Sequence, residues 1–184
     1  MHVEPATQQD LPELAEVAAT TFPLACPPSV SPDNVAAFIA ENLSAERFSA
    51  YLDDPDRMVL VVRHDTRIVG YAMLIHGVPD DPDVAGAVAL RPAMELSKMY
   101  ALPDVHGAGM SAALMAEVIA RCAALGAACL WLGVNQENQR AQRFYTKSGF
   151  SVSGTKTFRL GGHIENDYVM VLDLGGLGGR SQRQ

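Results

Sequence analysis

Apolar residues in the first third of the chain recur at the spacing of helices. Leu11, Leu14 and Ala18 fall three or four positions apart, which predicts a helix from residue 7 or 10 to about 19. A proline-rich loop is expected at 22–28. Ser31-Pro32-Asp33 supplies a hydroxyl cap, a proline for the first turn and an acid at the positive end of the helix dipole. The apolar positions from 35 to 52 therefore predict one broken helix or two short ones.

After residue 57 the pattern changes to β-branched apolar runs, which predict strands. The runs at 58–63 and 68–75 flank a polar hairpin tip, and 95–102 predicts another strand. A strand at 128–134 lies between predicted helices at 109–125 and 139–148. Gly161-Gly162 separates the strands of a last hairpin, 155–160 and 164–174. Residues 2–6 predict a first strand, and the apolar piece at 84–90 within the loop 77–92 is not assigned.

This order of elements predicts an α+β fold, a mixed and mostly antiparallel sheet flanked by helices. The 184 residues suit one domain, expected to span 1–174. The tail at 175–184 is glycine-rich and polar, so it is predicted to be disordered.

Composition narrows the function classes. Hydrophobic residues make up 48% and charged residues 19% of the chain, as in globular proteins. A net charge of -7 without a basic patch argues against a nucleic-acid partner. Three cysteines without a CxxC pair support neither a disulfide framework nor a metal site. The chain shows no signal segment and no apolar run near the roughly 20 residues of a membrane span, which predicts a cytoplasmic protein.

The segment His106-Gly107-Ala108-Gly109-Met110-Ser111 joins the strand at 95–102 to a helix. A helix N-terminus has unpaired N–H groups and glycines admit a ligand close to them, so the segment suits phosphate oxygens. A tight turn would explain the glycines equally well. A Walker loop is excluded because Met110 follows Gly109 where lysine is needed, and a dinucleotide site because no acid follows the strand at 128–134.

Two blocks together resemble the GCN5-related N-acetyltransferase (GNAT) family. The run at 102–115 resembles its acyl-CoA-binding motif. Leu130-Trp131-Leu132-Gly133-Val134-Asn135-Gln136-Glu137-Asn138, followed by Phe144-Tyr145 and Gly149-Phe150, lies at the spacing of its second block. The resemblance implies a GNAT-type fold and acetyl transfer from acetyl-CoA to a primary amine of a small molecule or peptide, by direct transfer. Dimers are common on this fold, so a homodimer stays open.

The resemblance also implies roles for single positions. Backbone amides of the glycine segment would bind the CoA pyrophosphate, and backbone groups of the preceding strand would pair with the pantetheine arm. Tyr145 would be the general acid. The implied CoA-binding residues are Met99, Ala101, His106, Gly107, Ala108, Gly109, Met110, Ser111, Ala112, Asn138 and Tyr145. His106 replaces the usual Gln or Arg, and Ser111 the usual Gly or Ala.

Gly133 bears on the branch of the family. The branch that acetylates ribosomal-protein N-termini has a glutamate here as its base, and Gly133 argues against that branch. The ending at 161–170 looks instead like the polyamine-acetylating, PaiA-like branch. A non-catalytic CoA-binding regulatory module on the same fold is the alternative function.

Direct transfer needs a neutral amine, whereas an alkylamine of pKa near 10.4 is about one part in a few thousand free base at pH 7. Glu95 is the first candidate base, because strand alternation puts it on the face of Ser97, Met99 and Ala101. A solvent-facing carboxylate at a strand start is an equal alternative. The Met99 N–H is the candidate oxyanion donor.

Tyr145 is better suited to hydrogen bonding than to early proton transfer. Protonating a thiolate of pKa near 8.5 from a tyrosine near 10 is uphill by roughly 1.5 units, or about 2 kcal/mol. A core tyrosine beside Phe144 and Phe150 is the alternative role for this residue.

Overall fold

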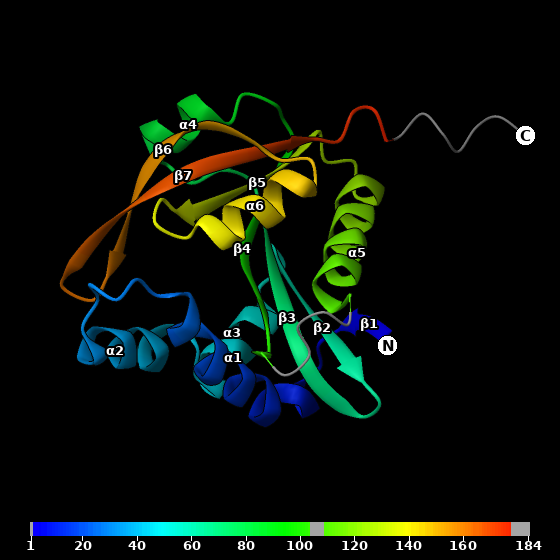
Figure 1. Ribbon diagram of the computed structural model, residues 1–184. Helices are drawn as coiled ribbons and strands as arrows, with labels where there is room; N and C mark the ends of the chain where they lie inside the picture. Colours follow the sequence, from blue (N-terminus) through cyan, green and yellow to red (C-terminus); the bar gives the residue numbers. More distant parts are fainter. Residues whose placement is uncertain (1, 104–108, 178–184) are drawn as a thin grey trace, which may run out of the picture.

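The computed structural model describes residues 2–103 and 109–177, which form a seven-stranded sheet with helices packed on its faces (Figure 1). This α+β architecture confirms the predicted fold class. In chain order the elements are β1 (His2–Pro5), the 3-10 turn η1 (Gln8–Asp10), α1 (Leu11–Ala25), α2 (Pro32–Asn42), α3 (Ala45–Asp53), β2 (Arg57–His64), β3 (Arg67–His76), α4 (Pro82–Ala87), β4 (Ala93–Ala101), α5 (Met110–Ala124), β5 (Cys129–Asn135), α6 (Gln139–Lys147), β6 (Ser151–Leu160) and β7 (His163–Asp173).

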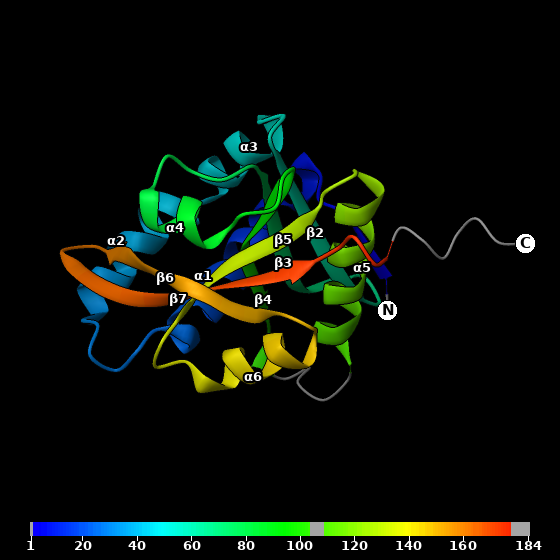
Figure 2. The ribbon, with the colours of Figure 1, turned by 90° about the horizontal axis from the view of Figure 1, so that it is seen from above.

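The sheet has the order β1-β2-β3-β4-β5-β7-β6, and β4 and β5 are its parallel pair. These two strands pair only at Ala93–Cys129, Met94–Leu130 and Glu95–Trp131. Beyond Glu95 they separate, so one edge of β4 has no strand partner among the described residues. Figure 2 shows α3 and α4 on one side of the sheet and α6 on the other. The hydrogen-bonded sheet is therefore split between β4 and β5 beyond Glu95.

The prediction of a loop at 22–28 is wrong at its start, because α1 continues to Ala25 with Pro23 inside it. The reason is tertiary packing around Phe22. Its ring stacks on Phe38 with the centroids 4.5 Å apart, and it meets the ring of Tyr100 at 6.3 Å. Burial of these aromatic surfaces outweighs the preference of proline to end a helix.

The second predicted helical region consists of two short helices rather than one. The Ser31 hydroxyl accepts a hydrogen bond from Asn34 N at 3.2 Å, and the Ser44 hydroxyl accepts one from Arg47 N at 3.1 Å. Each serine is thus the N-cap of its own helix. The unassigned piece after residue 77 contains the short helix α4, which Asp81 caps.

A β-bulge in β4 corrects the predicted face of Glu95. Opposite β3, Leu96 pairs with Leu74 and Lys98 with Met73, so Ser97 is the extra residue. The phase of alternation changes there. Lys98 and Tyr100 share the face of Glu95, whereas Met99 and Ala101 point to the opposite face.

Candidate active site

A cavity of about 260 Å³ occupies the gap between β4 and β5, and we call it the cleft cavity. On one side of the sheet it is lined by Phe22 and Phe38 of α1 and α2. On the other it reaches Ala141 and Tyr145 of α6. Residues 95–100 of β4 and 133–135 of β5 form its walls, and the β6–β7 hairpin closes one end. The cavity thus reaches both faces of the sheet.

A second cavity of about 220 Å³ lies against the end of β4 and the first turn of α5. Met99, Asn138 and Tyr145 line both cavities. Ala101 and Ser111 line the second cavity but not the cleft cavity. Five predicted site residues therefore meet at one place, although they come from three different elements, β4, α5 and α6. Glu95 lies in the cleft cavity only.

The glycine segment is described only from Gly109, because His106, Gly107 and Ala108 lie outside the described residues. Gly109 is the N-cap of α5 with φ 74°, a left-handed conformation that suits glycine. The side chain of Met110 is buried in the core, whereas Ala112 is exposed. The first backbone N–H groups of α5 begin at this point, next to the cavity that Ser111 lines.

Backbone groups of Met99 and Ala101 face the gap. Leu102 N donates to Val69 O at 2.8 Å, which marks a hydrogen-bonded pair between β4 and β3. In an antiparallel ladder such pairs alternate with pairs whose N–H and C=O groups point outward. Ala101, and Met99 two residues before it, therefore direct their backbone groups away from β3, where β5 has already separated.

Asn138 and Tyr145 belong to α6, whose start Asn138 caps. Asn138 Oδ1 accepts a hydrogen bond from Ala141 N at 3.1 Å. The half-buried Tyr145 ring packs at 5.6 Å from Phe144 and 5.9 Å from Phe150. Its hydroxyl makes no hydrogen bond to any residue that the structure describes. Burial raises the pKa of Tyr145 to about 12, so the phenol is a donor at neutral pH.

Glu95 lies among cations. Burial raises the pKa of its carboxyl group, and the positive charges of Lys156, Lys98 and Arg57 oppose this rise. Burial lowers the pKa of Lys98 to about 8, although Glu95 beside it acts in the opposite direction. The bulge is what brings Lys98 to the Glu95 side of β4.

Lys156 passes over Gly133 to reach Asp167. Its Nζ lies 3.6 Å from Asp167 Oδ2, and both side chains are largely buried. A Cβ added at Gly133 would overlap Lys156 Cε and lie 3.2 Å from Asp167 Oδ2. The missing side chain at Gly133 thus provides the space that this ion pair occupies.

Sequence reasoning missed four charged residues of the cleft cavity, Lys98, Lys156, Glu165 and Asp167. A bulge leaves no local signal by which Lys98 could be found. Glu165 and Asp167 alternate with Ile164 in a visible period of two, but here the acids face inward. Ile164 is 55% exposed and Glu165 only 8%. The usual assignment of the apolar face to the core fails for this strand.

None of the helices in the described ranges has the length and apolarity needed to cross a membrane. Within the same residues no group of three or more acidic, histidine or cysteine side chains is arranged to hold a metal ion.

Comparisons with known proteins agree on one family. Residues 19–150 match the Acetyltransferase (GNAT) family. An uncharacterized N-acetyltransferase of Mycobacterium tuberculosis is 60% identical over 165 residues, which cover 90% of this chain and 98% of that protein. An uncharacterized N-acetyltransferase of Lactobacillus delbrueckii is 22% identical over 89% of this chain and 92% of that protein.

Solved structures from different branches of the family share this fold with similar TM-scores. The PaiA N-acetyltransferase of Thermoplasma acidophilum, solved with coenzyme A, superposes with a TM-score of 0.71 at 20% identity, over 94% of this chain and 99% of that one. A ribosomal-protein-alanine N-acetyltransferase of Brucella melitensis gives 0.68, also at 20% identity and the same coverage. PaiA is thus one distant structural neighbour among several, and the resemblance to its branch is not distinguished by fold.

Proposed function

The chain belongs to the GNAT family and is an N-acetyltransferase, and from this premise we propose that it moves the acetyl group of acetyl-CoA directly to a primary amine of a small, polyamine-like molecule. The family uses acetyl-CoA.

The observation that carries the proposal is the cleft cavity through the β4–β5 gap. Met99, Tyr145 and Glu95 all line it, and the Tyr145 hydroxyl makes no hydrogen bond to the described residues. A thioester and an amine can thus approach from opposite faces of the sheet without a covalent intermediate on the protein. Direct transfer needs this arrangement because both reactants must be present together.

The unpaired edge of β4 suits the amide-containing pantetheine arm, which would pair with it as a strand does. The N-terminus of α5 suits the pyrophosphate. Both features lie next to the cavity that Ala101 and Ser111 line. The capping bond from Ala141 N fixes the position of Asn138, which lines both cavities.

In the proposed reaction the amine nitrogen attacks the thioester carbon, the C–S bond breaks and CoA leaves as the thiolate. Glu95 takes the proton that the amine loses, and the Met99 N–H stabilises the oxyanion. The Tyr145 hydroxyl donates a hydrogen bond to the leaving sulfur. Full proton transfer from a tyrosine of pKa about 12 to a thiolate near 8.5 would be uphill by roughly 3.5 units, or about 5 kcal/mol. The thiolate therefore takes its proton from solvent, or from Tyr145 only late in the reaction.

A small acceptor is favoured over a protein N-terminus by the residues of the cavity. Position 133 lacks the glutamate of the branch that modifies ribosomal proteins, and Lys156 fills the space of its side chain. The β6–β7 hairpin approaches α2 at the opposite end, where Gly162 N lies 3.4 Å from Asn34 Oδ1. This contact joins the hairpin to α2 at that end.

Release of the CoA thiol, with mass spectrometry of the product, tests the proposal against a panel of diamines, simple monoamines and peptides. We expect turnover with small amines and little with peptides. Tight acetyl-CoA binding without turnover on any acceptor would favour the non-catalytic module instead. Peptides acetylated faster than amines would overturn the choice of acceptor.

A further inference from the structure

Glu165 is a buried acid in the wall of the cleft cavity, and only one of its two oxygens accepts a hydrogen bond from the described residues. Its side chain is 9% exposed, and Oε2 accepts a hydrogen bond from Asn135 Nδ2 at 2.9 Å. Oε1 is buried and accepts no hydrogen bond from the described residues. His163 Nε2 lies 2.8 Å away as an ion-pair neighbour, but that ring is 42% exposed at the hairpin tip.

The acids of this cavity outnumber its ammonium groups. Glu95, Asp167 and Glu165 line it together with Lys98 and Lys156. Lys156 is paired with Asp167 at 3.6 Å, and Lys98 is coupled to Glu95. Glu165 is the remaining carboxyl group, and its ion-pair neighbour is the His163 ring at 2.8 Å, which carries a charge only when it is protonated. A buried carboxylate without a permanent cation is costly. A ligand that brings one positive charge would correct this imbalance.

Aromatic rings beside Glu165 form a surface that suits ammonium groups. Phe38 and Phe158 meet edge to face with their centroids 5.6 Å apart. Two ammonium groups of the protein already lie over these rings, Lys98 at 6.0 Å from Phe38 and Lys156 at 5.5 Å from Phe158. Phe158 also pairs with Glu165 across β6 and β7. Cation–π attraction and a carboxylate thus act at the same place.

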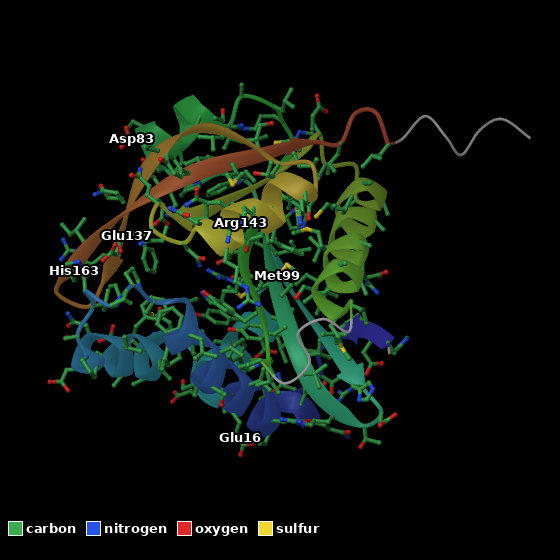
Figure 3. All side chains as sticks on the ribbon, in the orientation of Figure 1. Glu16, Asp83, Met99, Glu137, Arg143 and His163 are labelled. Carbon is green, nitrogen blue, oxygen red and sulfur yellow. The ribbon has the colours of Figure 1, made fainter. Side chains whose placement is uncertain are left out.

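We propose that Glu165 binds a second ammonium group of the acceptor, so that the substrate is a small amine with two cationic ends. This inference rests on the proposed function, since the first amine must receive the acetyl group. Figure 3 places Met99 near the centre of the molecule and His163 at the outer tip of the hairpin. The acceptor would extend from the centre toward that tip, with its far ammonium group at Glu165 and the Phe38–Phe158 rings.

Matched pairs of substrates test this subsite. Each α,ω-diamine is compared with the monoamine in which a methyl group replaces the far ammonium. In Glu165→Gln, which is isosteric and can still accept from Asn135, we expect the diamine KM to rise roughly tenfold or more. The monoamine KM and the KM for acetyl-CoA should stay unchanged. Equal KM values for diamines in the variant and the wild type would overturn the subsite.

Glu137→Gln is the matched control, because Glu137 is an exposed acid of the adjacent loop that does not line the cleft cavity. It removes the same charge and should retain wild-type KM values. Thermal melting of both variants checks the fold. The diamine length with the largest effect of Glu165→Gln reports the distance from the transfer point to Glu165.

Calorimetric titration of the same diamines into the protein saturated with coenzyme A separates the two proposals. Binding that Glu165→Gln weakens, without acetylation of any amine, would support the subsite and refute the proposed function. Acetylation of amines with no difference between diamines and monoamines would support the function and refute the subsite.

Discussion

The Tyr145 hydroxyl combines a high pKa with freedom from hydrogen bonds to the described residues. Burial raises the pKa of Tyr145 to about 12. The same residue lines both cavities. A group of this kind can donate to a developing thiolate without losing an existing partner.

Tyr145→Phe is expected to lower kcat about ten- to hundredfold, the value of a hydrogen bond to a charged group. The Kd of acetyl-CoA should change by less than about twofold, because the ring packing with Phe144 and Phe150 is retained. Steady-state kinetics and calorimetry measure the two quantities. Unchanged kcat would exclude Tyr145 from the reaction.

Lys156 is expected to determine the acidic limb of the pH profile. As the proposed base, Glu95 must be ionised to accept a proton, and its pKa is raised by burial and lowered again by Lys156. Lys156→Met removes the opposing charge, so the pKa of Glu95 rises further. The acidic limb of kcat/KM should therefore move to higher pH, while the alkaline limb stays in place.

Lys156→Arg, which retains the charge, is the control for this shift and should leave the limb near its wild-type position. In a Glu95→Gln background the Lys156→Met change should not move the limb. A shift of the same size in that background would mean that another group, not Glu95, is the base.

At the scale of elements, β4 is the strand on which the site depends. Its bulge determines the face of the sheet on which Lys98 and Tyr100 lie. Its separation from β5 leaves an edge without a strand partner among the described residues. On the other side β4 is held close to β3 at Gly70. A Cβ added there would lie 2.8 Å from Tyr100 O and 3.0 Å from Val62 Cγ1.

Gly70→Ala should lower the free energy of unfolding by about 1–3 kcal/mol, because backbone atoms of β4 must move away from the added methyl group. It should also raise the KM for acetyl-CoA, since the displaced strand carries the Met99 edge. Gly86→Ala in α4 is the matched control, with nothing within 4 Å of the added Cβ and a helical site that favours alanine. Urea unfolding compares the two. Equal stability would contradict the close contact.

At the scale of the whole molecule, we expect the domain to end at Leu174. This residue is 3% exposed in the main core, and its N–H donates to Ala128 O at 2.9 Å. Leu177, three residues later, is 51% exposed. The contacts of the domain therefore reach Leu174.

Truncation after Gly176 should leave the free energy of unfolding within about 0.5 kcal/mol of the full chain. Truncation after Asp173 should lower it by about 2 kcal/mol or more, since a buried leucine and one hydrogen bond are lost. Urea unfolding of both truncated chains measures the difference. Loss of stability in the longer one would extend the domain beyond the predicted boundary at 174.

The elements and the family could be predicted from the sequence because their signals are local. Apolar periodicity, serine caps and glycine positions act within a few residues, and they predicted most helices and strands. The two motif blocks between 95 and 150 led to the acetyltransferase family, which the comparisons confirm. The end of α1 was missed because Phe22 stacks on Phe38 of another helix.

The charges of the site were decided only by the tertiary structure. One extra residue in β4 moved Lys98 to the side of Glu95 and turned Met99 away from it. Gly133, noted in the sequence for the glutamate it lacks, turned out to leave space for the pair between Lys156 and Asp167. Such contacts join residues far apart in the chain, and their energies depend on burial that no local pattern records. Local chemistry determined which elements form and which protein family the chain resembles, whereas long-range packing determined which charged side chains line the cleft cavity.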